Sequence, residues 1–336
     1  MSRVVRSRAP LRLSFAGGGT DVSPFPENEG GVVLSATIDK YAYGSLTPRP
    51  DSRVSVHSHD LDMSLDYDLS DIPDFDGKLD LVKAAVRRLG GDSSGFDMVL
   101  RSNAPPGSGL GSSSTMLVAL VGLLREYHRL PLTEYEIADL AYQAEREDLQ
   151  IRGGHQDHYA ATFGGFNFIE FGERVIVNPL RIKDSTMHEL QLNLMLCYTG
   201  TTRQSSRIIE DQTARVTGGD SETLEGLRAQ KELAVAMKSA LLRGELSEFG
   251  SMLGEAWKQK KRMSPLIATE FIEEAYDVAM REGALGGKVT GAGGGGYILF
   301  YCDFTRQHRL AEALTRMGGV VTPFAFEPRG LTTWRA

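Results

Sequence analysis

Residues 105–115 read PPGSGLGSSST, and this stretch decides how the rest of the chain is interpreted. Three glycines, at positions 107, 109 and 111, alternate with other residues between a pair of prolines and a run of serines. Glycine brings no side chain to a hydrophobic core, and ordering it on folding costs more entropy than ordering any other residue. The stretch therefore indicates a segment whose bare backbone is needed by a partner.

The segments on either side of this stretch suggest what the partner is. Residues 95–103 alternate apolar and polar side chains, which predicts a strand, and residues 113–128 are apolar nearly all round, which predicts a buried helix. Free N–H groups at the start of a helix favour an anion, and glycines let such groups close around it. The stretch thus predicts a phosphate-binding loop. A tight turn capped by serines is the alternative without a ligand.

Two common kinds of phosphate loop do not fit this spacing. A Walker loop needs a lysine before the Ser or Thr that follows its last glycine, but Gly111 is followed directly by Ser112. A dinucleotide-binding fingerprint needs the pattern GxGxxG, whereas this stretch has GxGxG. A dinucleotide-binding oxidoreductase therefore remains only a weak alternative.

Composition narrows the class of protein. The 336 residues predict about two domains, and the net charge of −7 argues against binding to nucleic acid or to an anionic membrane. No apolar run approaches the roughly 18 residues of a membrane helix, and the N-terminus has no apolar stretch of signal length. We therefore expect a cytoplasmic protein. Cys197 and Cys302 lie in apolar runs and predict buried, reduced thiols.

Predicted strands and helices are mixed along the chain without strict alternation, which favours an α+β protein of two domains over a doubly wound sheet. Thr133 and Glu136 form a capping-box pattern at the start of a helix. The other expected strands are 12–15, 30–48, 52–60, 164–171, 173–180, 190–200, 296–303 and 320–327, and the expected helices are 79–90, 132–148, 221–244, 245–262, 268–284 and 305–319.

Two further glycine-rich stretches make the interpretation specific. RAPLRLSFAGGGTD (8–21), the central stretch and KVTGAGGGGYILF (288–300) resemble, in the right order, the three motifs of the GHMP kinase superfamily of galactokinase, homoserine, mevalonate and phosphomevalonate kinases. FAGGGTD and GGHQDHYAATFGG (153–165) resemble its sugar-1-kinase branch. The resemblance covers nearly the whole chain. It implies an N-terminal mixed α/β domain over 1–185, with a left-handed crossover phosphate loop, and a ferredoxin-like C-terminal domain over 186–336.

The resemblance also implies ATP and Mg²⁺ as cofactors. Ser113 would bind Mg²⁺ through its hydroxyl, with Ser114 as a close rival, and Glu145 would supply a carboxylate; a solvated helix charge is the alternative for Glu145. The residues expected to bind the ATP phosphates are Pro106, Gly107, Ser108, Gly109, Leu110, Gly111, Ser112, Ser113 and Ser114.

Asp157 matches the catalytic aspartate of the superfamily, and Arg12 matches a basic residue near the transferred phosphoryl group. Phosphoryl transfer depends on positioning and charge neutralisation more than on a strong base. A metal site is the alternative for the HQDH sequence, because His155 and His158 are three residues apart and can share a helix face. Arg12 would otherwise be an ordinary strand-surface arginine.

The implied reaction is phosphorylation of a sugar at its anomeric hydroxyl, with heptose 7-phosphate as the expected substrate, in the synthesis of activated heptose for surface polysaccharide. An unphosphorylated sugar such as L-fucose or galactose is one alternative, and a non-catalytic nucleotide- or sugar-binding regulator is another. We expect no nucleic-acid or membrane partner, and a monomer or a homodimer. The residues expected to bind the sugar are Gly18, Gly19, Thr20, Asp21, Gly154, Asp157, Arg203 and Gly293.

Several of these sugar-site assignments have structural alternatives. Asp21 can instead cap the following turn, and the cluster 291–296 can serve close packing alone. Arg203 is the residue expected to bind a distal phosphate, because guanidinium groups suit phosphate well. Lys260 and its basic neighbours in WKQKKR (257–262) are expected to form a solvated helix face.

Overall fold

The computed structural model describes residues 4–90, 94–201 and 205–336. Within these residues the larger sheet has eight strands: six follow the order β12-β1-β2-β5-β3-β4, β6 pairs with β2, and β7 pairs with β6. The strands of this sheet are β1 (Val5–Ala16), β2 (Gly31–Pro48), β3 (Arg53–Ser58), β4 (Met63–Asp68), β5 (Phe96–Ser102), β6 (Phe166–Phe171), β7 (Ile176–Pro179) and β12 (Thr332–Arg335).

The long strand β2 organises this sheet because its two ends pair with different partners. Its first residues pair with β6, from Gly31 opposite Phe171, and its last residues pair with β5, from Ala42 opposite Ser102. Strand β5 also runs parallel to β3. The side chains expected to face the core from β5, including Phe96 and Leu100, are buried, so the predicted alternation is confirmed.

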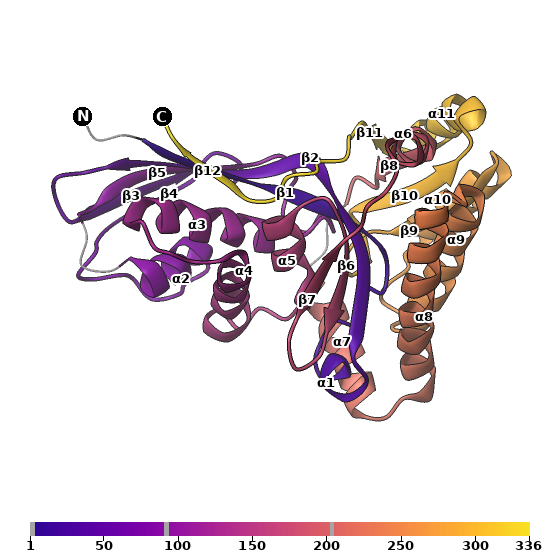
Figure 1. Ribbon diagram of the computed structural model, residues 1–336, viewed down its shortest axis with the longest axis horizontal. Helices are drawn as coiled ribbons and strands as arrows, with labels where there is room; N and C mark the ends of the chain where they lie inside the picture. Colours follow the sequence, from indigo (N-terminus) through magenta and orange to yellow (C-terminus); the bar gives the residue numbers. More distant parts are fainter. Residues whose placement is uncertain (1–3, 91–93, 202–204) are drawn as a thin grey trace.

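Helices α2–α5 lie on one face of the larger sheet (Figure 1). They are α2 (Asp80–Leu89), α3 (Ser112–His128), α4 (Glu134–Gln143) and α5 (Gln156–Phe163). Helix α3 is buried along most of its length, as predicted. The capping box at the start of α4 is also confirmed: Thr133 accepts from the backbone of Glu136, and Glu136 accepts from the backbone of Thr133. A π-helical turn, Ala144–Asp148, follows α4.

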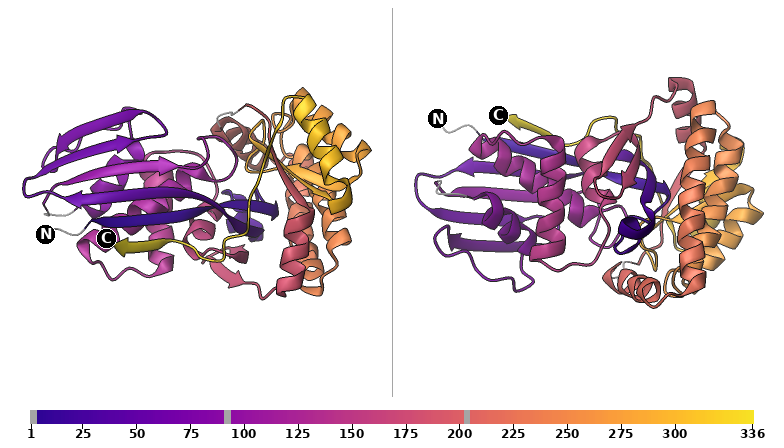
Figure 2. Two further views of the ribbon diagram at one scale, coloured as in Figure 1. Left: turned by 90° about the horizontal axis from the view of Figure 1, so that it is seen from above. Right: turned by 60° about the horizontal axis from the view of Figure 1, so that its bottom comes forward.

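The second half of the chain forms a four-stranded antiparallel sheet, ordered β11-β8-β10-β9, with helices packed against it (Figure 2). Cys197 and Cys302 are buried free thiols on β8 and β10, as expected. The elements are α6 (Asp184–Asn193), β8 (Leu194–Tyr198), α7 (Ser205–Thr217), α8 (Ser221–Arg243), α9 (Leu246–Arg262), α10 (Glu270–Arg281), β9 (Ala284–Val289), β10 (Tyr297–Cys302), α11 (Gln307–Arg316) and β11 (Val320–Thr322).

Several segments of this half differ from the sequence-based expectation, among them three strands of the second sheet. The strand expected over 190–200 begins only at Leu194, because the preceding residues belong to α6. Strand β9 was not predicted; Gly286 and Gly287 give it little strand character. The strand expected over 320–327 ends at Thr322, since the following Pro323 has no N–H for a sheet ladder.

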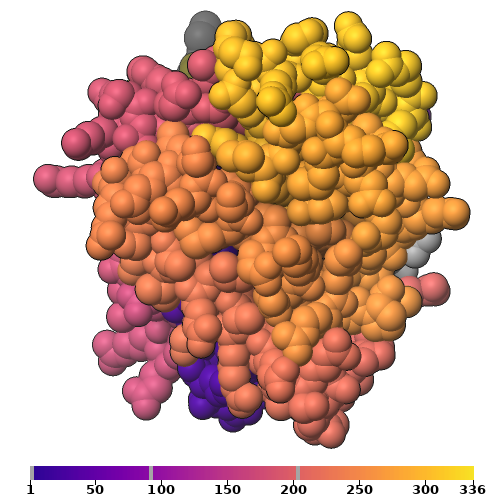
Figure 3. All heavy atoms as spheres, turned by 90° about the vertical axis from the view of Figure 1, so that its right-hand side faces the viewer, coloured from indigo at the N-terminus to yellow at the C-terminus, as the bar shows by residue number. Residues whose placement is uncertain are grey.

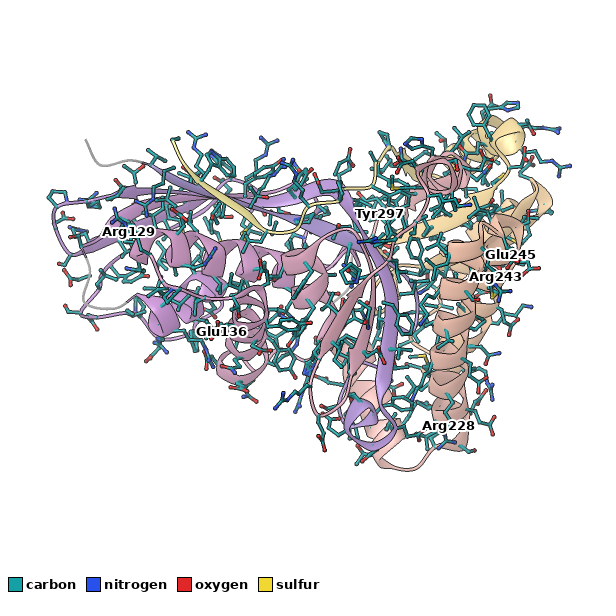
Figure 4. All side chains as sticks on the ribbon, in the orientation of Figure 1. Arg129, Glu136, Arg228, Arg243, Glu245 and Tyr297 are labelled. Carbon is teal, nitrogen blue, oxygen red and sulfur yellow. The ribbon has the colours of Figure 1, made fainter. Side chains whose placement is uncertain are left out.

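The two halves are joined by backbone and side-chain contacts. Strand β12 returns to the larger sheet and pairs with β1, which places both chain ends at the same end of the molecule (Figure 1). Tyr297 lies where the halves meet, and its N–H donates to the carbonyl of Ser108 at 3.1 Å (Figure 4). Arg228 binds Glu29 through two hydrogen bonds, of 2.8 and 2.7 Å. We propose a domain boundary between residues 185 and 186. Strand β12 lies after this boundary in the sequence but belongs to the sheet of the first half.

The outer face of the second half is covered by its own helices. Seen from that side, residues coloured orange to yellow form most of the surface, and the N-terminal segment, in indigo, is visible mainly at the lower edge (Figure 3). In the described part of the chain, no helix is both long enough and apolar enough to span a membrane.

Candidate functional site

A cavity of about 530 Å³ lies where the three glycine clusters meet. Gly18 and Gly19 line it from the first cluster, Gly107, Gly109 and Gly111 from the second, and Gly291 from the third. The fold therefore brings together three stretches that are far apart in the sequence, as the motif order predicts. Both halves of the molecule contribute to the cavity, because α7 and α9 also line it.

The central glycine loop leaves the start of α3 open to the cavity. Gly107, Gly109 and Gly111 have φ values of 74°, 81° and 77°, a region that side-chain-bearing residues rarely adopt. Gly111 immediately precedes α3, so no side chain caps the first N–H groups of that helix. Uncapped amides at a helix start form a ready site for an anion.

The serines that follow the loop do not act as helix caps. The hydroxyl of Ser112 donates to the Pro105 carbonyl at 3.3 Å. Ser113 and Ser114 donate to the two carboxylate oxygens of Glu145, at 2.7 and 2.6 Å. The structure therefore does not contain the alternative, a tight turn stabilised by serine caps.

The third glycine cluster packs backbone to backbone against the central loop. A Cβ atom on Gly109 would lie 2.6 Å from the Thr290 carbonyl oxygen, and one on Gly296 would lie 2.2 Å from that of Ser108. Gly291 lines the cavity, whereas Gly293 packs against Ile267 and is not among the lining residues. Close packing therefore accounts for several glycines of this cluster, whereas Gly291 also faces the cavity.

Arg12 and Asp157 form a partly buried ion pair at the cavity wall. The Nε atom of Arg12 donates to Oδ1 of Asp157 at 2.7 Å, and another of its nitrogens lies 2.6 Å from the same oxygen. Arg12 also donates to the Gly109 carbonyl at 2.6 Å. A Cβ atom on Gly111 would lie 2.9 Å from the Asp157 carboxyl, so the carboxylate lies directly against the start of α3.

Glu145 lies on the π-helical turn, fully buried, and receives donors from several elements. His158 contacts its Oε2 at 2.8 Å, and Arg146 lies 3.2 Å from the same atom. Burial alone would raise the pKa of Glu145, but the Arg146 charge and the hydrogen bonds from His158 and Ser114 outweigh it and lower the pKa to about 2. The carboxylate is therefore a fixed negative charge beside Ser113.

The two histidines of the HQDH sequence have partners other than a metal ion. The ring of His155 stacks on Tyr142 with 3.8 Å between ring centroids, and burial, reinforced by the His158 and Arg146 charges, lowers its pKa to about 3. His158 is buried against Glu145. Among the described residues, no group of three or more His, Cys, Asp or Glu side chains is arranged to hold a metal ion.

Asp21 is buried, and its carboxylate caps the start of α5 instead of the turn that follows it in the sequence. Its carboxylate accepts from the backbone N–H of Gln156 at 3.0 Å, at the start of α5, and from the N–H of Gly19 at 3.1 Å. A Cβ atom on Gly154 would lie 2.0 Å from this carboxylate, which explains the glycine at that position. Thr20 faces the interior, where its hydroxyl donates to the carbonyls of Gly17 and Val32.

Most of the predicted site residues line the one cavity. Ser108 and Leu110 belong to the loop but are buried and do not line the cavity. Thr20 and Gly293 also lie outside the lining, and Arg203 falls outside the described residues. The predicted residues that line the cavity are Arg12, Gly18, Gly19, Asp21, Pro106, Gly107, Gly109, Gly111, Ser112, Ser113, Ser114, Glu145, Gly154 and Asp157.

Three basic residues that line the site were missed or misjudged from the sequence: Arg146, Arg152 and Lys260. Arg146 donates to the carbonyls of Ile151 and Gly154, at 3.0 and 3.2 Å, and so braces the loop before α5. Lys260, expected on a solvated face, is only 4% exposed and lines the cavity. Its position three residues after Trp257, on the buried face of α9, was the available signal.

A second cavity, of about 580 Å³, adjoins the first. Both are lined by Pro106, Ser112, Ser113 and Ile151. The sequence did not indicate it, because its walls come from several separate segments. Its apolar lining includes Leu61, Phe75, Leu79, Leu81, Val82, Leu100, Met116 and Leu149.

Comparison with known proteins supports one family over both halves of the chain. Residues 80–165 match the N-terminal domain of GHMP kinases, and residues 237–319 match the C-terminal domain. The chain is 41% identical to a D-glycero-alpha-D-manno-heptose 7-phosphate kinase of Campylobacter jejuni, over 99% of both chains.

Solved structures agree with this similarity. A D-glycero-D-manno-heptose 1-phosphate kinase from Bacteroides thetaiotaomicron superimposes with a TM-score of 0.83 at 38% identity, over 99% of both chains. A Lactococcus lactis galactokinase complexed with galactose superimposes with a TM-score of 0.79 over 98% of this chain and 95% of its own. Its identity is 20%, so that match supports the fold alone.

Proposed function

Because the chain belongs to the GHMP kinase family, we propose that it transfers the terminal phosphoryl group of ATP to the anomeric hydroxyl of a heptose 7-phosphate. One observation carries the proposal: the Arg12–Asp157 pair lies against the uncapped start of α3, inside the cavity that the three glycine clusters enclose. A phosphate-binding helix start and a carboxylate for the acceptor are thus side by side. The product would be the 1,7-bisphosphate.

The two cavities would bind different parts of ATP. The phosphates would bind at residues 106–114, where backbone N–H groups at the start of α3 are free to donate. The nucleoside would occupy the adjoining apolar cavity, which shares Pro106, Ser112 and Ser113 with the first. This placement puts the terminal phosphorus near Asp157.

Ser113 and Glu145 fit a hydrated Mg²⁺. Both supply oxygen ligands, and Glu145 stays charged because its pKa is lowered to about 2 by the neighbouring Arg146, His158 and Ser114 despite its burial. When bound, Mg²⁺ neutralises charge on the phosphates. The remaining bonds of Glu145, to Ser114 and His158, would hold its carboxylate in place.

Asp157 orients the acceptor hydroxyl. Both Arg12 contacts go to Oδ1, which leaves Oδ2 for a ligand in the cavity. As the new P–O bond forms, the hydroxyl proton passes to Asp157 and the bond between the phosphoryl group and ADP breaks. Arg12 keeps the carboxylate oriented and adds a positive charge where negative charge develops on the phosphoryl oxygens.

The choice of sugar rests on the relative that is 41% identical, whose name specifies a heptose 7-phosphate. Asp21, Gly18, Gly19 and Gly154 would surround the sugar, because they line the cavity and Asp21 binds the backbone of Gln156, the residue before Asp157. Arg203 remains our proposed contact for the distal phosphate. We also propose a cytoplasmic enzyme, acting in the synthesis of activated heptose for surface polysaccharide.

A screen of acceptors tests this function. The purified protein with ATP and Mg²⁺ would be offered heptose 7-phosphate, the unphosphorylated heptose, L-fucose and galactose, and ADP release would be measured. We expect turnover chiefly with heptose 7-phosphate, and phosphorus NMR should show a new phosphate on the anomeric carbon. Preferred turnover of an unphosphorylated sugar would overturn the substrate, and ATP binding without turnover of any acceptor would point to a regulator.

A further inference from the structure

Lys260 is a buried cation that the mechanism above does not use. It comes from α9 in the second half of the chain and reaches the cavity wall, where only 4% of the residue is exposed. Its helix neighbours on the same face, Leu253, Ala256 and Trp257, are core residues. An ammonium group in such a setting is costly to bury without a compensating partner.

The contacts of Lys260 within the described residues compensate for only part of its charge. Its Nζ donates to the Gly291 carbonyl at 2.6 Å, and no carboxylate in the described part of the chain forms an ion pair with it. An ammonium has three N–H donors, so two remain for a ligand. Arg12 differs here, because Asp157 balances its charge.

The contacts of Lys260 place it close to the reacting groups. Lys260 binds Gly291, and a Cβ atom on Gly291 would lie 2.6 Å from the Cα of Gly109. Gly109 in turn accepts a hydrogen bond from Arg12. The two cations are therefore anchored on glycines that touch each other, one from each half of the molecule.

We propose that Lys260 is a further catalytic residue whose ammonium contacts the phosphoryl group during its transfer. The inference rests on the proposed function and adds a cation from the second half of the chain. Negative charge on the phosphoryl oxygens would supply the partner that Lys260 lacks, and a preorganised donor in a site closed to water stabilises such charge strongly. Lys260 and Arg12 would then approach the phosphoryl group from the two halves.

The Lys260 ammonium could bind another phosphate group instead, the distal phosphate of the sugar. The neighbours of Lys260 favour the transferred group, because Arg12 and Gly109 belong to the phosphate side of the cavity. Kinetic measurements distinguish the two contacts. A contact with the transferred group changes kcat for every acceptor, whereas a contact with the distal phosphate changes KM for the phosphorylated sugar.

Lys288 provides a matched control. It is also a buried lysine, 2% exposed, and it donates to a backbone carbonyl, that of Ser14, at 2.9 Å. It is not among the residues that line the cavity. Replacement of Lys288 therefore reports on the structural role of a buried lysine that does not line the cavity.

The experiment compares Lys260→Met, Lys260→Arg and Lys288→Met with the unmodified protein. We expect kcat to fall about 100-fold in Lys260→Met and less in Lys260→Arg, with the affinity for ADP changed less than about 3-fold. Binding of ADP with aluminium fluoride and the sugar phosphate, measured by calorimetry, should weaken by a similar factor in Lys260→Met. Lys288→Met should keep kcat within about 3-fold.

The pH profile gives a second readout. Burial, together with the Arg12 charge, lowers the pKa of Lys260 to about 8, while Asp21 opposes this shift and Lys288 is the other charged neighbour. Because the protonated form is the active one, kcat should fall as pH rises through about 8. In Lys260→Arg this alkaline decline should move to higher pH, since arginine stays charged.

Each outcome decides between the alternatives. An unchanged kcat in Lys260→Met, or a lower melting temperature as its only effect, would refute the inference. A raised KM confined to the phosphorylated sugar would assign Lys260 to the distal phosphate instead. If the unmodified protein phosphorylates no acceptor, the proposed function itself fails, and that result is distinct from the other two.

Discussion

Two carboxylates flank the start of α3, and their surroundings are opposite in kind. Glu145 is fully buried and receives Ser113, Ser114, His158 and Arg146. Asp157 keeps 17% of its side chain exposed and is held by Arg12 through one oxygen. A carboxylate surrounded by donors is a fixed charge, whereas one with a free oxygen can receive a hydroxyl proton.

This contrast assigns different tasks to residues of the same chemical type. Glu145 suits the task of holding a cation near the phosphates, because protonation is opposed by every neighbour that donates to it. Asp157 suits the task of orienting a hydroxyl, because Arg12 fixes one oxygen and the cavity is open to the other. Three substitutions test whether the two tasks are separate.

The largest effect is expected at the open carboxylate. Asp157→Asn keeps the shape of the side chain but removes its ability to accept a proton, so we expect kcat to fall about 1,000-fold. The affinity for ATP should change less than about 3-fold, because the loop and the start of α3 are untouched. An assay of ADP release measures kcat, and isothermal titration calorimetry measures the affinity for ATP. Loss of nucleotide binding would contradict the separation of the two tasks.

A smaller and different effect is expected at the closed carboxylate. Glu145→Gln removes the fixed charge, so we expect the Mg²⁺ concentration for half-maximal activity to rise about 10- to 100-fold. Excess Mg²⁺ should restore part of kcat, which it cannot do for Asp157→Asn. Glu147→Gln is the control: Glu147 is two residues away, its side chain is 61% exposed, and its pairing with Arg88 lies outside the cavity lining. An unchanged Mg²⁺ requirement in Glu145→Gln would contradict the proposal that Glu145 holds the metal ion.

The smallest effect is expected where the loop meets the open carboxylate. Gly111→Ala places a methyl group 2.9 Å from the Asp157 carboxyl and forces alanine to a φ of 77°. We expect about a 10-fold loss of kcat and a loss of about 1–2 kcal/mol in the free energy of unfolding. The Mg²⁺ requirement should stay unchanged, because Glu145 is not contacted. A shifted Mg²⁺ requirement would show that the two carboxylates are coupled.

Sequence alone predicted the parts of the site that depend on local backbone chemistry. The alternating glycines before an apolar segment indicated the loop at the start of α3. The resemblance to the GHMP kinases implied that Arg12, Asp157 and Glu145 belong to one site, and in the structure all three line one cavity. Most strands and helices were likewise found from their periodicity. The loop, the strands and the helices are each encoded within a few consecutive residues, which is why pattern analysis finds them.

The missed features depend on contacts between distant segments. Strand β12 has only four residues and is a strand because β1 offers an edge, a fact that its own sequence does not contain. Lys260 sits in a basic run that favours solvent, and its burial follows from the packing of α9 against the second sheet. The adjoining apolar cavity likewise exists only once its separate walls are assembled.

The central claim is that Asp157 orients the anomeric hydroxyl toward a phosphate tail bound at the start of α3. A crystal structure with a non-hydrolysable ATP analogue and heptose 7-phosphate tests it most directly. We predict the anomeric oxygen within about 2.6–3.2 Å of an Asp157 carboxylate oxygen, with the phosphates against residues 107–113. A sugar bound with its anomeric oxygen beyond the reach of Asp157, or phosphates bound elsewhere, would contradict the account.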